Sequence, residues 1–105
     1  MVEVIVTHSA QQQRTSLLQY INEAFGARVA LKVYSQLEHY HSLLVANPCL
    51  GAVEPLLIDY PEGYRSLVVH KHCKLVYYVD ELGQKLYVTD FWDVRRAPAT
   101  LVANK

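Results

Sequence analysis

The chain has 105 residues, of which 51% are hydrophobic and 19% charged, so it can form a packed core and is not intrinsically disordered. Ten basic and ten acidic side chains give a formal net charge of zero, which argues against a strongly basic nucleic-acid-binding domain but leaves local patches open. The length suits a single domain over residues 1–105.

A strand and two helices are predicted for the first half of the chain. Residues 2–7, VEVIVT, are β-branched and apolar, which predicts a strand. Ser9 with Gln12 matches a capping box that would start a helix, and Gly26 would end it. Its apolar side chains recur at helical spacing: Leu17, Leu18, Ile21 and Phe25. A second helix would stop at Asn47-Pro48, with one apolar stripe formed by Ala30, Val33, Leu37, Tyr40 and Leu44. The short link predicts an antiparallel helical hairpin.

The second half is predicted to be mostly strands. Prolines and glycines mark residues 48–63 as loop, with a short strand expected at 56–59. Apolar patterning predicts strands at 64–71, 73–79 and 85–92, with DELGQ at 80–84 as the turn between the last two. The order β-α-α-β-β-β predicts an α+β domain, with the helical hairpin packed on one face of a small, mostly antiparallel twisted sheet.

A two-residue turn at Lys71-His72 would decide which side chains share a face of that sheet. The turn would place Arg65 opposite Tyr78 and Lys74 opposite Val69. One face would then carry Arg65, Leu67, Val69, Lys74, Val76 and Tyr78. The other face is richer in apolar side chains and is expected to pack on the helices. The first would face solvent and suit a phosphate backbone, a stacked base or an amphipathic protein segment. The alternative is a half-buried strand pair with snorkelling cations.

Three short motifs add to the element order. They are GYRSLVVH at 63–70, KLVYYV at 74–79 and VTDFWDVRRAP at 88–98. Together they resemble the RelE/ParE superfamily of bacterial type II toxin–antitoxin toxins, over most of the chain. The resemblance implies a toxin that is neutralised by a cognate antitoxin and that needs no cofactor or metal. RelE-like members are ribosome-dependent endoribonucleases that bind and cut mRNA, whereas ParE-like members inhibit DNA gyrase.

The resemblance also implies candidate site residues. Lys74 falls where the ribonucleases carry a catalytic arginine, Arg65 falls near a family lysine, and Arg95 or Arg96 falls near a second arginine. With Tyr78 these four form the candidate catalytic set, and Lys71 and Tyr87 are candidate substrate-binding residues. The C-terminal tyrosine of the ribonucleases has no counterpart, so Tyr78 or Tyr87 would have to replace it. The zero net charge also departs from the basic character of ribosome-binding members.

RNA cleavage would require the ribose 2′-OH to attack the neighbouring phosphate. The protein would have to remove that proton, stabilise the charge on phosphorus and protonate the leaving oxygen. Arg65, Arg95 or Arg96 would hold the phosphate, and Lys74 would donate the proton if its pKa were lowered. His70 and His72 are the more natural bases, although His70 is expected to point at the helices.

A second hypothesis is a non-catalytic interaction module on the same fold. Leu67, Val69 and Val76 would then bind a partner peptide across the exposed sheet face. Salt discriminates the two hypotheses, because RNA binding weakens steeply with ionic strength and apolar binding does not. A zinc site at His70, His72 and Cys73 is a weaker alternative, since a turn at 71–72 would separate these residues.

The compartment is expected to be the cytoplasm. The start, MVEVIVTHSA, has no basic n-region or long apolar h-region, and no apolar stretch is long enough to cross a bilayer. Cys49 and Cys73 do not make a disulfide framework and are expected to be reduced. The tail, from Ala99 to Lys105, has no periodic signal and is expected to fray or to complete an interface.

Overall fold

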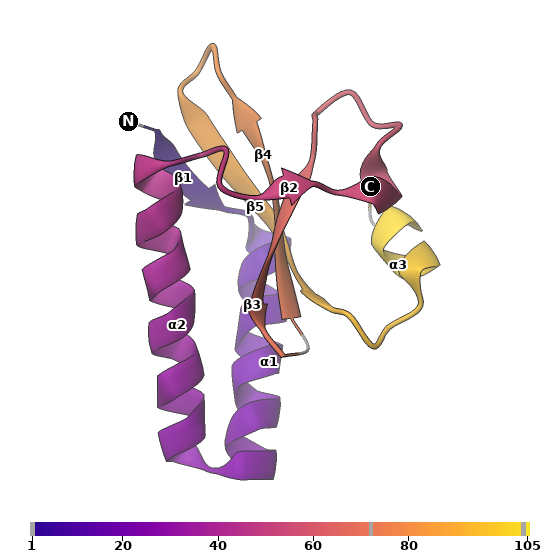
Figure 1. The fold of residues 1–105 in the computed structure, drawn as a ribbon. Helices are drawn as coiled ribbons and strands as arrows, with labels where there is room; N and C mark the ends of the chain where they lie inside the picture. Colours follow the sequence, from indigo (N-terminus) through magenta and orange to yellow (C-terminus); the bar gives the residue numbers. More distant parts are fainter. Residues whose placement is uncertain (1, 72, 104) are drawn as a thin grey trace.

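A computed structural model describes residues 2–71, 73–103 and 105 and confirms the predicted α+β class. The elements in chain order are β1 (Glu3–Val6), α1 (His8–Phe25), α2 (Ala27–Ala46), β2 (Ala52–Val53), the 3₁₀ turn η1 (Pro55–Leu57), β3 (Arg65–His70), β4 (Cys73–Asp80), β5 (Lys85–Asp93) and α3 (Pro98–Ala103). The strands form one sheet in the order β1-β5-β4-β3-β2, with β1 parallel to β5 and the other neighbours antiparallel (Figure 1). Among the described residues, no helix is both long and apolar enough to span a membrane.

The first helix starts two residues earlier than the capping-box prediction. Thr7, not Ser9, is the N-cap, and its side-chain oxygen accepts a hydrogen bond from the Ala10 N–H at 3.2 Å. The Thr7 N–H donates to the Val88 carbonyl at 3.0 Å, which ties the cap to β5. Because this bond holds Thr7 in extended backbone at the end of β1, the helix begins directly after it.

The helical hairpin is confirmed, and Gly26 makes it possible. Gly26 has a φ of 95°, a conformation that L side chains rarely adopt, and its N–H donates to the Asn22 carbonyl. The chain therefore reverses within one residue, and α2 runs back beside α1 (Figure 1). The second helix ends at Asn47, as predicted.

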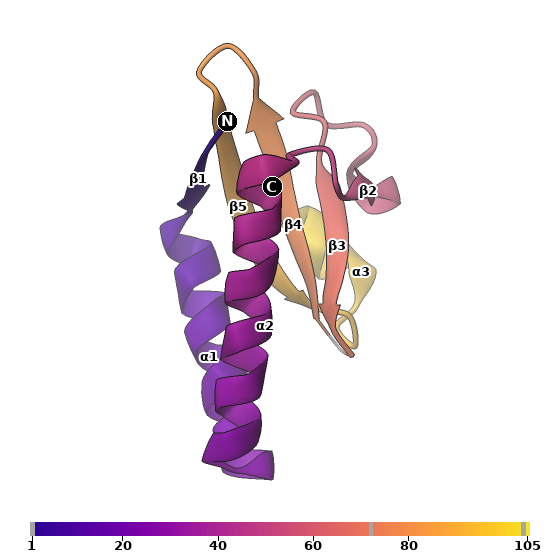
Figure 2. The same ribbon diagram turned by 60° about the vertical axis from the view of Figure 1, so that its left-hand side comes forward.

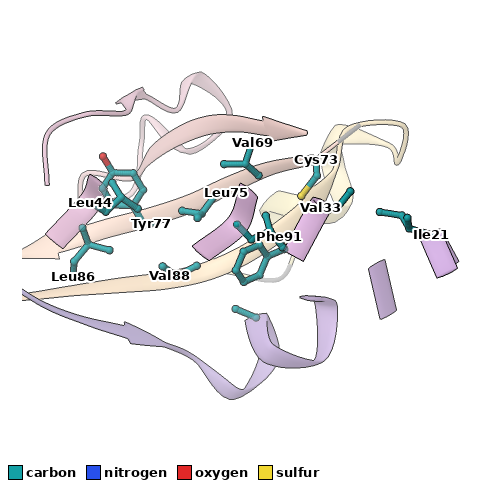
Figure 3. Close-up of a cluster of buried hydrophobic side chains, with 12 residues drawn as sticks. Ile21, Val33, Leu44, Val69, Cys73, Leu75, Tyr77, Leu86, Val88 and Phe91 are labelled. Carbon is teal, nitrogen blue, oxygen red and sulfur yellow. The ribbon is translucent and has the colours of Figure 1, made fainter. Parts of the chain in front are cut away.

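The main core lies between the hairpin and one face of the sheet. The predicted stripe of α2 supplies Val33, Leu37 and Leu44, which are almost completely buried. They pack against alternate side chains of the two central strands, including Leu75 and Val88 (Figure 3). The odd-numbered positions of β4 are therefore the ones that face the helices, as predicted.

The opposite face of the sheet is covered as well, contrary to the prediction that it faces solvent. A second cluster of buried side chains joins Leu57 of η1, Val76 of β4, Trp92 of β5 and Leu101 of α3. Figure 2 shows α3 behind the sheet, away from α1 and α2. Within the tail, α3 (Pro98–Ala103) packs on the sheet, because Leu101 is fully buried in the cluster at the centre of this face.

The β3–β4 register also differs from the prediction. His70 pairs with Cys73, which fits a two-residue connection, but a bulge between Val68 and His70 shifts the rest of the ladder by one residue. Arg65 consequently lies opposite Tyr77 instead of Tyr78. A one-residue slip moves a side chain to the other face, so the predicted partition of β3 is wrong.

The loop before β3 contains no strand at 56–59. Residues 55–57 form the 3₁₀ turn instead, because Pro55 sets its first position and the Glu54 side chain caps the Leu56 N–H at 2.8 Å. The short strand β2 lies earlier, and its residues Ala52 and Val53 pair with the start of β3.

Candidate functional site

Lys74 is the centre of a buried polar network on the sheet face opposite the helices. Its ammonium donates to the Glu54 carboxylate, which also accepts a hydrogen bond from the Ser66 hydroxyl at 3.0 Å. The Glu54 side chain is 1% exposed and that of Lys74 is 17% exposed. Ser66 pairs with Val76 across the strands, so their side chains lie on the same face of the sheet. Val76 and Lys74 are two residues apart on β4, so Lys74 shares that face. The ammonium is thus already occupied by a carboxylate.

The network lowers the pKa of Glu54. Burial of the carboxyl group would raise that pKa, but the hydrogen bonds from Lys74, the Leu56 N–H and Ser66, with the charge of Lys74, outweigh the burial. Glu54 therefore stays ionised at neutral pH and remains paired with the Lys74 ammonium.

Arg65 lies on the other face of the sheet, beside the end of α2. Its guanidinium donates to the Gly51 carbonyl at 2.7 Å. Its cross-strand neighbour Tyr77 is fully buried, and the Tyr77 hydroxyl donates to the Pro48 carbonyl and accepts from the Gly51 N–H. Arg65 therefore helps to anchor the loop before β2 and does not share a face with Lys74.

Arg95 and Arg96 lie beyond the end of β5, at the rim of a cleft against α1. Arg95 is held by Asp93 through two hydrogen bonds of 3.0 and 2.9 Å and stacks on Tyr20 of α1. The guanidinium of Arg96 lies 5.2 Å from the centroid of the Trp92 ring. The cleft has a volume of about 390 Å³, and its α1 wall combines polar side chains such as Ser9 and Gln12 with Leu17 and Tyr20.

The remaining predicted residues are not assembled with these cations. Lys71 is exposed in the β3–β4 connection. Tyr78 and Tyr87 are half-buried and stack on each other across β4 and β5, with ring centroids 5.2 Å apart. The expectation that Leu67, Val69 and Val76 form an exposed floor is wrong. Val69 and Val76 are 4% and 0% exposed, and Leu67 packs against the helix-side core.

A second buried ion pair was missed by the sequence analysis. Asp90 is 1% exposed and accepts hydrogen bonds from the Lys105 ammonium, the Gln13 amide and the Thr89 hydroxyl. Gln13 of α1 also accepts the Phe91 N–H at 2.8 Å, just past the point where β1 stops pairing with β5. Residues this far apart in sequence carry no local pattern that would identify the network.

The sequence cluster typical of zinc is not reproduced as a site. His72 lies outside the described residues, and within residues 2–71, 73–103 and 105 no group of three His, Cys, Asp or Glu side chains is placed to hold a metal ion. Burial raises the pKa of the Cys73 thiol to about 12, so this cysteine is a core residue in its neutral form.

Comparisons with known proteins identify the fold. No protein-family model matches the chain, and no curated protein matches it significantly. Among solved structures it is similar to a chain of the chromosomal ParDE toxin–antitoxin system from P. aeruginosa. The TM-score is 0.72 at 18% identity, and the match covers 90% of this chain and 97% of that chain. The predicted RelE/ParE-type fold is thereby confirmed.

Proposed function

We propose that this protein is the toxin of a type II toxin–antitoxin pair that acts by binding a protein target and not by cutting RNA. The fold shared with a chain of a ParDE system supports the toxin assignment. By the same likeness, the proposed partners are a cognate antitoxin and, as in ParE-like toxins, DNA gyrase. The proposed compartment is the cytoplasm, where both partners would be met.

The main support for a function other than RNA cleavage is the ion pair between Lys74 and the buried Glu54. An in-line attack on a phosphodiester needs unpaired cations gathered around one phosphate. Here Lys74 is neutralised, Arg65 lies on the opposite face, and Arg95 is neutralised by Asp93. The Trp92–Leu101 cluster fills the sheet face on which RNA would have to lie. The arrangement supports a stable scaffold with side chains for protein binding at its rim.

The cleft between α1 and residues 93–96 is the surface that we propose for the target. Its two arginines are preorganised by ring stacking on Tyr20 and Trp92, which reduces the side-chain entropy lost on binding. Stacked arginines and tyrosines of this kind are enriched among the residues that dominate protein interfaces.

Two parallel assays with the purified protein test the proposal. We expect inhibition of DNA supercoiling by gyrase and no cleavage of mRNA on programmed ribosomes, with a RelE-type ribonuclease as the positive control for cleavage. Arg96→Ala removes an exposed side chain and should weaken gyrase inhibition at least about fivefold. Arg28→Ala removes an exposed arginine of α2 that does not line the cleft, and it serves as the matched control. Ribosome-dependent cleavage that is lost in Lys74→Ala would contradict the proposal.

A further inference from the structure

Four tyrosine rings form a row across the sheet face that does not carry the helical hairpin. Tyr78 of β4 stacks on its cross-strand neighbour Tyr87 of β5, with centroids 5.2 Å apart. Tyr64, just before β3, meets Tyr78 edge to face at 5.4 Å. Tyr60, in the loop after η1, meets Tyr64 at 6.2 Å. Neighbouring rings thus connect the loop after η1 with the two central strands.

The row continues to the edge of the sheet at β1. Ile5 pairs in register with Tyr87. Val4 and Val6 pack into the helix-side core, so the alternation of side chains places Ile5 on the opposite face with the tyrosines. Ile5, Tyr78 and Tyr87 are each half-buried, so part of each side chain remains open to solvent.

Carboxylates border one side of this row. Asp80 is the next residue of β4 on the same face as Tyr78, and Glu3 occupies the corresponding position of β1. Glu62 accepts a hydrogen bond from the Tyr64 hydroxyl at 3.2 Å. Lys85 lies opposite Asp80, which leaves this border with a net negative charge. Burial raises the pKa of Tyr78, and the charges of Glu62 and Asp80 add to that rise.

The second ring of the row, Tyr64, already binds a cation of this chain. The Lys105 ammonium lies 5.7 Å from the centroid of the Tyr64 ring and pairs with Asp90. A cation over an aromatic face with a carboxylate beside it is a favourable arrangement. The Tyr78–Tyr87 end repeats the combination of rings and carboxylates, and among the described residues no Arg or Lys side chain lies over either ring.

We propose that Tyr78, Tyr87 and their carboxylate border bind a basic segment of a partner protein, with an arginine or lysine over the rings. Ile5 would contact an apolar side chain of the same segment. The net negative charge of the carboxylate border favours a basic protein segment over a nucleic acid. RNA bases would also stack on tyrosines, but the phosphates would meet a border whose three carboxylates outnumber its one cation, Lys85. This inference does not depend on the proposed toxin function.

A titration of the ¹⁵N-labelled full chain with a tetra-arginine peptide tests the inference. We expect amide shifts concentrated at Ile5, Tyr78 and Tyr87. Tyr78→Leu keeps an apolar side chain on the strand and should raise the dissociation constant about threefold, because one ring face is lost. Tyr78→Phe keeps the ring and should bind within about twofold of the wild type.

Matched controls separate this site from general charge attraction. Tyr34→Leu removes an exposed ring of α2 and should leave the dissociation constant unchanged. Circular dichroism of each variant establishes that it is folded. Shifts gathered at Glu23 or Glu38 of the hairpin, or equal affinity of the wild type and Tyr78→Leu, would overturn the inference. Tighter binding at this face of a twelve-residue oligouridine than of the peptide would also overturn it.

Discussion

Replacing Lys74 by methionine separates a structural lysine from a catalytic one. Lys74→Met leaves the Glu54 carboxylate 1% exposed without its ion-pair partner. Breaking a buried ion pair costs about 3–5 kcal/mol. Glu54 keeps its hydrogen bonds from Ser66 and the Leu56 N–H, and Lys74 itself is 17% exposed. We therefore expect the free energy of unfolding to fall by about 2–3 kcal/mol, less than for a fully buried pair. The melting temperature should fall by roughly 10 °C.

The double variant Glu54→Gln/Lys74→Met should recover most of that loss. A neutral amide at position 54 still accepts the Leu56 N–H and bonds Ser66, and no buried charge remains. We expect a coupling energy of about 1–2 kcal/mol between the two substitutions. Urea denaturation measures it, with the fluorescence of the buried Trp92, the chain's only tryptophan, as the signal.

The pH dependence of stability provides an independent measurement. The folded-state pKa of Glu54 is lowered below its usual 4.5, so its contribution is present above about pH 4.5 and is lost as pH falls through the folded-state value. Glu54→Gln should lack this acidic component. Under the proposed toxin function, toxicity in cells should be lost together with stability in Lys74→Met and should return in the double variant. A double variant that is stable but not toxic would refute a purely structural role for Lys74.

Three further substitutions test the packing around the sheet by urea denaturation. Gly51→Ala should destabilise by about 2 kcal/mol or more, because a Cβ there would lie 2.8 Å from the Ser66 carbonyl oxygen, and a normal unfolding midpoint would contradict this crowding. Tyr77→Phe should cost about 1–3 kcal/mol, because the buried Gly51 N–H loses its acceptor, and a cost no larger than that of the exposed control Tyr34→Phe would argue against that role. Leu101→Ala should cost about 2–4 kcal/mol, because its side chain is fully buried, and a cost near zero would show that α3 does not cover the sheet in solution.

The order of the elements and the helix-side core could be predicted from the sequence because both rest on local patterns. The stripe of α2 gives Val33, Leu37 and Leu44 directly, and Gly26 marks the reversal between the helices. The start of α1 was misplaced because Thr7 and Ser9 are both good N-cap residues. The backbone bond from Thr7 to Val88, which decides between them, is a tertiary contact.

The positions of the predicted cations in the fold could not be predicted from local sequence patterns. The bulge before His70 is one extra residue without a sequence signal, and it moves Arg65 to the other face. The partner of Lys74 is Glu54, twenty residues away in a loop, and only the folded chain brings the two together. Arg95 and Arg96 followed the strand end as expected, but their stacking on Tyr20 and Trp92 depends on how α1 and β5 pack.

The side-chain amide of Gln13 bears on how the protein associates with other copies of itself. Where β1 stops, β5 would otherwise present an open backbone edge, and such edges recruit further strands into intermolecular sheets. Gln13 occupies the Phe91 N–H at that point and holds the Asp90 side chain beside it. Gln13 thereby occupies one donor of this edge, so we expect its loss to favour association through β5 and to lower solubility at high concentration.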